Sequence, residues 1–179
     1  SLNRAKDDVI ISSLGGNSRS TSGNIILPTA QKIAVGGTNL TKAKIIQAKT
    51  LFRTNEADEE AGEELYMLYN AAAAAQILAD TTLTSTDYLA GQFLREGSVR
   101  GKWMGFNWIP TERCPKVSTT RFLYAYAKSG VTLGKGADIM TKVGEDPGKG
   151  FNVRIYAKMS IGSVRVEEEK VVEIACLEP

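Results

Sequence analysis

One stretch near the end of the chain constrains the fold more than any other. From position 151 to position 161, apolar and polar residues alternate without a break, and a period of two fits an extended strand but not a helix. The alternation predicts a strand with one buried face and one wet face. Its apolar positions are Phe151, Val153, Ile155, Ala157, Met159 and Ile161.

The phase of this pattern changes at Gly162. Either a bulge or bend near Gly162 and Ser163 turns the strand, or the strand passes from one lobe of the protein to another. We favour the second interpretation. Beyond Gly162 the apolar side falls on even positions, at Val164, Val166, Val172, Ile174 and Cys176.

Helical patterns occupy the first half of the chain. Apolar residues at helical spacing predict helices over residues 2–14 and 40–53. Alanine, the best intrinsic helix former, predicts another over residues 70–80. A start signal at residues 84–87 and an end signal at Gly97 predict a fourth.

The predicted helix at residues 40–53 has a clear amphipathic pattern. It follows a possible cap at Asn39 or Thr41, and it carries lysines on the side opposite to its apolar face. We expect the face that contains Leu40, Ala43, Ile46 or Gln47, and Leu51 to point inward.

Strands dominate the rest of the chain. Residues 65–69 predict a short buried strand, and residues 15–39 favour a long loop with a short strand at 33–35. After Gly97, aromatic and β-branched runs alternate with Gly and Pro, which predicts mostly strands. Helices early and antiparallel strands late place the chain in the α+β class.

Composition narrows the function. A chain of 179 residues can form a core without a metal ion or a disulfide. Its 22 basic and 20 acidic residues leave a net charge of +2, which argues against a dedicated electrostatic nucleic-acid binder. It has no histidine, the usual general base and commonest metal ligand. We expect no enzyme, and no catalytic, cofactor or metal site.

The two cysteines indicate a reduced, intracellular setting. Cys114 and Cys176 form no CxxC motif, and no secretory apolar segment stands at the N-terminus. We expect both thiols to be small buried apolar groups. No apolar run approaches the ~20 residues that a membrane helix needs, so we expect no membrane contact.

Three carboxylates, Glu167, Glu168 and Glu169, stand in a row inside a run of valines. On an extended strand Glu167 and Glu169 would lie about 7 Å apart on one side, as in an inverting glycan hydrolase. A carboxylate-dependent hydrolase is therefore one alternative function. Glu168 and Lys170 fall on the apolar phase, however, so we favour a local break where the strand leaves one layer, with its charges solvated or paired.

An acidic cluster precedes the predicted strand at 65–69. It lacks the spacing of a calcium loop, so we favour a solvated turn. The runs GVTLGKGAD (130–138) and DPGKG (146–150) resemble phosphate loops only superficially, and we expect turns there. The carboxylates of the cluster are Glu56, Asp58, Glu59, Glu60, Glu63 and Glu64.

Basic and aromatic residues are interleaved between positions 95 and 121. Such a patch can bind single-stranded nucleic acid, which gives a second alternative function. Aromatic residues in this arrangement more often belong to a core or an interface, and we favour that interpretation. The residues are Arg95, Arg100, Lys102, Arg113, Lys116 and Arg121, with Trp103, Phe106 and Trp108.

Four segments, taken in order, resemble the major capsid protein of certain tailed bacteriophages. They are NRAKDDVIISSLGG, LPTAQKIAVGGTNLTKAKIIQAKTLF, LTSTDYLAGQFLREGSVRGKWMGFNWIPTERCP and the run from YAYAK to EIAC. They cover most of the chain. The most specific pieces are GxxxGKWMGFxWIP and the closing SxGSVRVEEEKVVEI, and neither is a catalytic signature.

The resemblance implies the Hong Kong 97-like coat fold, with an axial lobe and a peripheral lobe. By position, residues 1–39 (the end of a long helix and a loop) and a β-ribbon at 139–162 belong to the peripheral lobe. Residues 40–138 form the axial lobe, and residues 163–179 form a return strand to it. The family's N-terminal arm and extended loop have no counterpart in this sequence, so we expect a fragment.

The resemblance also implies a structural protein of the virion or of a prophage. Such a protein self-assembles into hexamers and pentamers and an icosahedral shell around double-stranded DNA. The expected partners are other copies of the chain, scaffold, portal or cement proteins, and DNA through weak non-specific contacts. Assembly would take place in the cytoplasm of the bacterial host. The carboxylates at 167–169 would then be a solvated or intersubunit strand edge.

Overall fold

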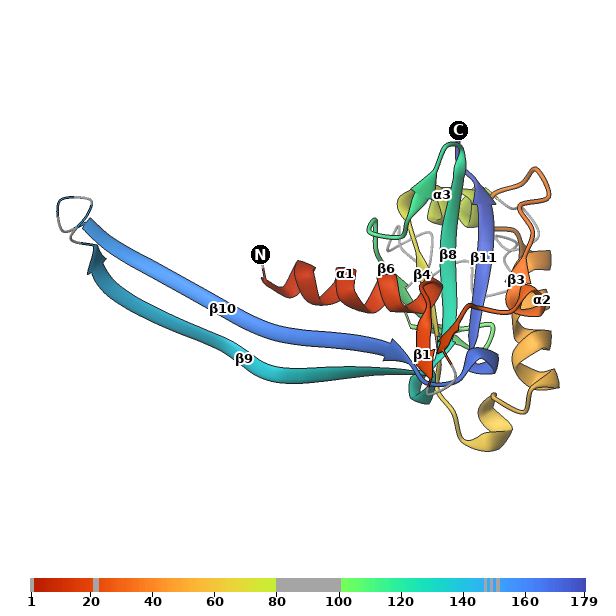
Figure 1. The fold of residues 1–179 in the computed structure, drawn as a ribbon. Helices are drawn as coiled ribbons and strands as arrows, with labels where there is room; N and C mark the ends of the chain where they lie inside the picture. Colours follow the sequence, from red (N-terminus) through yellow and green to blue (C-terminus); the bar gives the residue numbers. More distant parts are fainter. Residues whose placement is uncertain (1, 21–22, 80–100, 147, 149, 151) are drawn as a thin grey trace.

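The computed structural model describes residues 2–20, 23–79, 101–146, 148, 150 and 152–179. It has a globular part and a long two-stranded ribbon that leads away from it (Figure 1). Helices and strands both contribute to the globular part, as the α+β prediction requires. The predicted helix at 84–97 lies outside the described residues.

A mixed sheet of seven described strands forms the centre of the globular part. The strands are β3 (Lys32–Ile33), β4 (Leu65–Tyr69), β5 (Lys102–Trp103), β6 (Phe106–Pro110), β7 (Lys116–Val117), β8 (Thr120–Ala127) and β11 (Val171–Leu177). Their order is β3-β11-β8-β4-β6-β5, and β7 pairs with β8. The pairs β11–β3 and β4–β6 are parallel, and the other pairs are antiparallel.

Helices lie on both faces of this sheet. On one face, Phe52 of α2 (Lys42–Thr54) packs edge-on against Phe106 of β6, with ring centroids 6.0 Å apart. On the other face, Ile10 and Ile11 of α1 (Leu2–Gly15) line a hollow together with Leu68 of β4. The third helix, α3, spans Ala71–Ala79. None of the described helices is long and apolar enough to cross a bilayer.

Local signals set the helix ends as predicted. α1 ends at Gly15, and the N–H of Gly16 donates to the main-chain oxygen of Ser12 at 2.9 Å. Thr41 precedes α2 in an extended conformation, without a capping bond from its side chain. The side-chain oxygen of Asn70 accepts the N–H of Ala73 at 3.0 Å, which caps α3.

The inward face of α2 differs from the prediction. Ala43 and Ile46 are exposed, and Leu51 is only half-buried. The helix is therefore rotated relative to the expected orientation, and a lysine points inward. The buried residues are Lys44, Ile45, Ala48 and Phe52.

Lys44 explains this rotation. Its ammonium group donates three hydrogen bonds of 2.8 Å to main-chain oxygens, those of Val35, Thr38 and Ala175. A buried ammonium group is tolerated when all three of its donors are satisfied. The lysine thus joins the loop before α2 to strand β11.

The ribbon consists of β9 (Val131–Asp146) and β10 (Asn152–Arg165), so it is longer than the predicted 139–162. The two strands are antiparallel, with register shifts between Lys158 and Ile161. Such bulges bend a strand pair, and the ribbon curves along its length (Figure 1). A smaller antiparallel pair, β1 (Ser18–Ser20) and β2 (Gly23–Ile25), follows α1.

The predicted buried face of residues 151–161 is wrong for the outer part of the strand, whereas Met159 and Ile161 of that face are half-buried and Phe151 lies outside the described residues. All residues from Asn152 to Lys158 are exposed, because no other layer of the described chain covers this outer part of the ribbon. Gly162 is not the crossing point either, since it pairs with Gly134 inside the ribbon. The nearby irregularity is the register shift between Ser160 and Ile161. The chain passes into the globular sheet at residues 166–170, where the short helix η5 (Glu168–Lys170) precedes β11.

Candidate functional site

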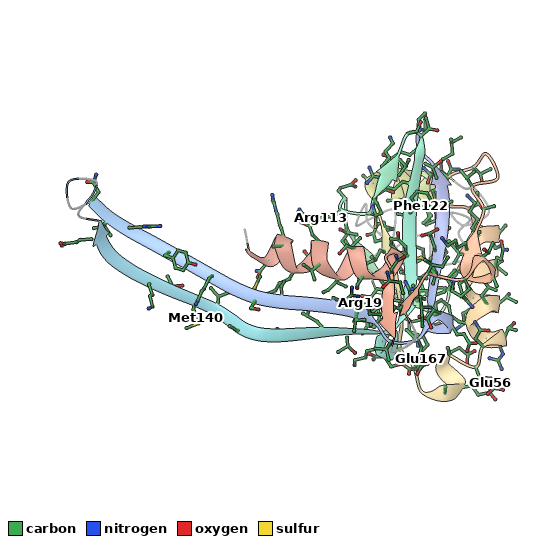
Figure 2. All side chains as sticks on the ribbon, viewed as in Figure 1. Arg19, Glu56, Arg113, Phe122, Met140 and Glu167 are labelled. Atoms are coloured by element: carbon green, nitrogen blue, oxygen red, sulfur yellow. The ribbon has the colours of Figure 1, made fainter. Side chains whose placement is uncertain are left out.

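Exposed apolar side chains gather on the ribbon. Most of the large apolar side chains that are exposed in the described residues lie on β9 and β10. Figure 2 shows side chains projecting from the ribbon well away from the globular part, Met140 among them. A surface of this kind marks a binding site for another molecule. The ribbon is therefore the candidate functional site.

One side of the outer ribbon, which we name the apolar face, consists of Val143, Val153 and Ile155. Ile155 lies opposite Val143 in the antiparallel register, so the two side chains share a face. Val153 is two residues from Ile155 and points to the same side. The three side chains are 67%, 69% and 71% exposed. Full burial of each side chain against a partner would contribute roughly 1.5–3 kcal/mol to the free energy of association.

The other side of the same segment, which we name the cationic face, consists of Lys142, Arg154 and Lys158 with Tyr156 and Met140. Lys142 lies opposite Tyr156, and Lys158 lies opposite Met140. Arg154 is two residues from Tyr156 and so shares its side. All five residues are exposed. The outer ribbon thus presents mainly apolar side chains to one side, where Glu145 lies opposite Val153, and three cations to the other.

Arg165 ties the ribbon to the globular part. It is the last residue of β10, and its side chain is fully buried. Nη1 donates 2.8 Å hydrogen bonds to the main-chain oxygens of Leu14 and Gly16, and Nη2 donates to that of Ile25 at 3.1 Å. Nε lies 3.7 Å from a carboxylate oxygen of Glu168. A cation at the carbonyl end of α1 is also favoured by the helix dipole.

Two hydroxyl contacts reinforce the root of the ribbon. Ser18 Oγ donates to the main-chain oxygen of Arg165 at 2.8 Å. The hydroxyl groups of Ser13 and Ser163 lie 2.8 Å apart, between α1 and β10. No sequence signal marked Arg165, because its partners are main-chain oxygens 140 to 151 positions away.

The carboxylates at 167–169 lie on the turn between β10 and β11. Glu168 contacts Arg165, and Glu167 lies 3.1 Å from the ammonium group of Lys170. Glu167 and Glu169 are exposed, and no described cleft encloses the two carboxylates as a hydrolase site would. The extended spacing on which the hydrolase alternative depended is absent. The predicted local break, with its charges solvated or paired, is confirmed.

The acidic segment at 55–64 is a turn at the same end of the globular part. Asp58 is almost fully buried and accepts the N–H of Glu60 at 3.1 Å, so the turn is solvated only in part. The Ser129 hydroxyl and the Lys170 ammonium group hold the pKa of Glu63 below its usual value. Within the described residues, no group of carboxylates and thiols is arranged to hold a metal ion. The ion pairs are Arg53 with Asp58 and Glu60, Lys128 with Glu64, and Lys170 with Glu63.

The two acidic segments form one surface, which we name the acidic end: residues 55–64 and 167–169. Lys170 joins them because it contacts both Glu63 and Glu167. The side-chain amide of Asn55 also donates to the main-chain oxygen of Glu169 at 3.4 Å. Figure 2 shows Glu56 and Glu167 at the end of the globular part from which the ribbon leaves.

The glycine-rich run GVTLGKGAD is not a phosphate loop. GVTLGKGAD was expected to be a turn, but residues 131–138 of it belong to strand β9. The run has an extended conformation, and its Gly134 pairs directly with Gly162 across the ribbon. DPGKG lies where β9 returns to β10, partly outside the described residues.

The aromatic residues at 103–108 belong to the core, as favoured from the sequence. Phe106 is fully buried, and Trp108 is 6% exposed. The rings of Trp103 and Trp108 lie 5.4 Å apart between centroids. Buried rings cannot stack on bases, so the nucleic-acid alternative loses its stacking surface.

Three of the four basic residues of that patch that the structure describes are paired with carboxylates. Arg121 donates to Glu178 from both Nε and Nη2, and Lys116 lies 3.5 Å from the same carboxylate. Arg113 contacts Asp8 of α1. Lys102 is exposed. Arg95 and Arg100 lie outside the described residues.

Both cysteines are buried free thiols, as predicted. Burial raises the pKa of Cys114 to about 12 and that of Cys176 to about 11. The thiols are therefore protonated near neutral pH and unsuited to nucleophilic chemistry.

Comparison with known proteins gives a consistent result. The sequence matches the family model described as phage capsid protein over residues 1–178. No curated protein matches it. Among solved structures, a chain described as Mycobacterium phage Che8 has 15% identity and a TM-score of 0.65, and the match covers 97% of this chain and 59% of that one.

Two further solved structures are similar. The capsid structure of the cyanophage P-SCSP1u has 16% identity and a TM-score of 0.63, with 99% of this chain and 62% of that one covered. The mature capsid of bacteriophage PhiM1 has 13% identity and a TM-score of 0.63, with 98% and 60% covered. The chain thus spans about three-fifths of the length of these chains, and at such identities the likeness is one of fold.

Proposed function

This chain belongs to the phage capsid protein family, and from that premise we propose that it is a structural subunit of a phage shell that associates with copies of itself. Its fold is the Hong Kong 97-like coat fold predicted from the sequence, since 97% to 99% of it is covered by the capsid structures it resembles. Such a subunit acts through shape and repeated contacts rather than through chemistry. Many weak interfaces, repeated over a shell, add up to a stable particle.

The apolar face of the ribbon is the observation that carries this proposal. In the single chain Val143, Val153 and Ile155 are exposed to water on a strand pair that no other described element covers. Association of copies would bury them. A protein that acts alone gains nothing from an apolar surface of this kind.

The proposal extends to the arrangement of lobes. α1 and the ribbon form the peripheral lobe, and the mixed sheet with α2 and α3 forms the axial lobe. The ribbon bounds of Val131 and Arg165 replace the expected 139 and 162, and residues 166–179 return to the axial lobe. The clear separation of ribbon and globular part in Figure 1 supports this division.

The proposal also covers how the copies assemble and which other molecules they contact. Copies form hexamers and pentamers of an icosahedral shell, which encloses double-stranded DNA in the virion after assembly in the host cytoplasm. Scaffold, portal or cement proteins are further partners, and contacts with DNA are weak and non-specific. Membership of the phage capsid protein family supports each of these points.

Electron microscopy and sedimentation velocity of the purified protein test the proposal. Rings or shells are expected from the unchanged chain. A variant with Val143→Ser, Val153→Ser and Ile155→Ser should keep its circular dichroism spectrum and lose assembly. Val117→Ser is the matched control, because Val117 is 65% exposed but lies on β7. Strictly monomeric behaviour of the unchanged protein at every salt concentration would contradict the proposal.

A further inference from the structure

The hollow between α1 and the sheet has a volume of about 170 Å³ and is mostly apolar. Its apolar lining consists of Ile10 and Ile11 of α1 and of Leu68, Ile109 and Pro110 of the sheet. Leu68 and Ile109 are neighbours in the β4–β6 pair, so their side chains share one face. An apolar cavity of about 150 Å³ takes a molecule of the size of benzene. The hollow therefore has room for one small molecule.

Three polar residues, Asp7, Thr111 and Tyr126, complete the lining. A few polar groups in a mostly apolar pocket decide which chemical class of ligand it binds. The hydroxyl group of Tyr126 is available, because it forms no hydrogen bond within the described part of the chain. Burial and the neighbouring Tyr66 raise the pKa of Tyr126, so the hydroxyl group stays neutral and can accept a hydrogen bond.

Asp7 brings a negative charge to the hollow. Its side chain is exposed, so it lies where the hollow meets solvent. The nearby guanidinium group of Arg113 donates from Nε and Nη2 to Asp8 instead. Arg4, one turn earlier on α1, is exposed and pairs with neither carboxylate among the described contacts. Asp7 thus has no cation bound to it in the described residues.

We propose that the hollow binds a small molecule with a primary ammonium group on an apolar body of about six to eight non-hydrogen atoms. The apolar body lies between α1 and the sheet, against Ile10 and Ile109. The ammonium group donates to the carboxylate of Asp7 and to the hydroxyl group of Tyr126. An ammonium group has three donors and no acceptor, which suits these two groups. The inference does not depend on self-association, so its failure would leave the proposed function untouched.

Other classes of ligand fit the hollow less well. A purely apolar molecule would gain burial but would leave Asp7 without a cation. A carboxylate or phosphate would be repelled by Asp7. A hard metal cation needs six or more oxygen ligands, and the apolar walls do not supply them. An amine with an apolar body uses both the walls and the charge.

A molecule bound in the hollow would join α1 to the sheet. Ile10 and Asp7 belong to α1, whereas Ile109 and Tyr126 belong to strands β6 and β8. The site therefore exists only while α1 is packed on the sheet. A ligand that binds only this state stabilises it by mass action. Hydrogen exchange of the α1 amides should slow as the amine is added.

Titration calorimetry and thermal unfolding with benzylamine test the inference. Benzyl alcohol and benzoate are matched probes of similar size that carry no charge and a negative charge. Benzylamine should raise the melting temperature and bind about three- to fivefold tighter than benzyl alcohol, and benzoate should bind more weakly than either. Asp7→Asn should remove the preference for the amine and leave binding of the alcohol unchanged. Glu145→Gln, at an exposed carboxylate on β9, should bind like the unchanged protein.

A second variant locates the site. Ile10→Trp fills the hollow, so it should abolish benzylamine binding while the circular dichroism spectrum is kept. Asp7→Asn changes only an exposed group and keeps the test decisive if Ile10→Trp does not fold. The inference is overturned if the unchanged protein does not bind benzylamine, or if it binds all three probes equally. It is also overturned if Asp7→Asn leaves the preference for the amine intact.

Discussion

Arg165 and Leu14 are 151 positions apart in the sequence, yet Nη1 of Arg165 donates a 2.8 Å hydrogen bond to the main-chain oxygen of Leu14. The same guanidinium group reaches the main-chain oxygens of Gly16 and Ile25. The end of α1 and the end of β2 thus meet at the point where β10 enters the globular part. One buried side chain thus joins the root of the ribbon to both segments.

The substitution Arg165→Met should lower the free energy of unfolding by about 3–5 kcal/mol. It leaves three main-chain oxygens without a donor and Glu168 without its cation. Urea denaturation measures the change. Arg19→Met is the control, because Arg19 is exposed on β1, and its effect should stay below about 0.5 kcal/mol. Equal effects of the two substitutions would contradict the role of Arg165.

The substitution Gly15→Ala should lower the free energy of unfolding by about 1–3 kcal/mol. An added Cβ would overlap the hydroxyl group of Tyr124, whose side chain is buried. Tyr124→Phe removes that hydroxyl group, so Gly15→Ala should cost less in that background. At Gly162 an added Cβ meets nothing within 4 Å, and Gly162→Ala should be nearly neutral. If the changes in the free energy of unfolding caused by Gly15→Ala and Tyr124→Phe simply add in the double variant, the overlap is ruled out.

The stability of the fold should decrease in acid partly through Glu178. The Arg121 guanidinium group holds the pKa of Glu178 below its usual 4.5. The unfolded chain therefore takes up this proton first as the pH falls. The stabilisation is complete above pH 4.5 and is lost as the pH falls through the lowered folded-state pKa.

Glu178→Gln removes this effect. The variant should be less stable than the unchanged protein at neutral pH, and its stability should depend less on pH below 4.5. Denaturant titrations at a series of pH values measure both quantities. The control is Glu169→Gln, at an exposed carboxylate, and its free energy of unfolding at neutral pH should stay within about 0.5 kcal/mol of that of the unchanged protein. A Glu178→Gln protein with the original acid sensitivity would argue against the pair with Arg121.

The thiols of Cys114 and Cys176 should not react with a disulfide reagent in the folded protein at neutral pH. Burial shields them and raises their pKa to about 12 and about 11, so little thiolate is present. Both should react once the chain is unfolded in urea. An exposed thiol introduced by Lys142→Cys should react at once and serves as the positive control. Rapid labelling of the unchanged folded protein would contradict the burial.

The elements that the sequence predicted well are those with local causes. The alanine run gives α3, the glycine pair at 15 and 16 ends α1, and the apolar run at 65–69 gives β4. Each signal acts within a few residues, so no knowledge of distant contacts is needed.

The inward face of α2 could not be predicted in this way. A lysine counts as polar in any periodic pattern, but Lys44 is buried because Val35, Thr38 and Ala175 supply its acceptors. Ala175 lies 131 positions away. The rotation of the helix is therefore decided by a tertiary contact that the local sequence does not contain.

The candidate site was visible only in part. The charged residues Glu168 and Lys170, at positions where the alternation expects apolar residues, correctly indicated a break in the strand. The alternation from 151 to 161 correctly separated an apolar face from a polar face. It did not show which layer, if any, covers the apolar face. An apolar pattern has the same form whether its partner belongs to the same chain or to another molecule. For this reason the alternation by itself predicts a core strand.

Because the ribbon is long, a small rotation at its root produces a large displacement of its far end. The fourteen residues of β10 extend roughly 45 Å, so a swing of about ten degrees at Arg165 carries the far end through about 8 Å. A sub-ångström adjustment around one guanidinium group is thereby magnified into a displacement as large as a side chain. A shell built from subunits with such ribbons can change its curvature while every globular part keeps its internal structure.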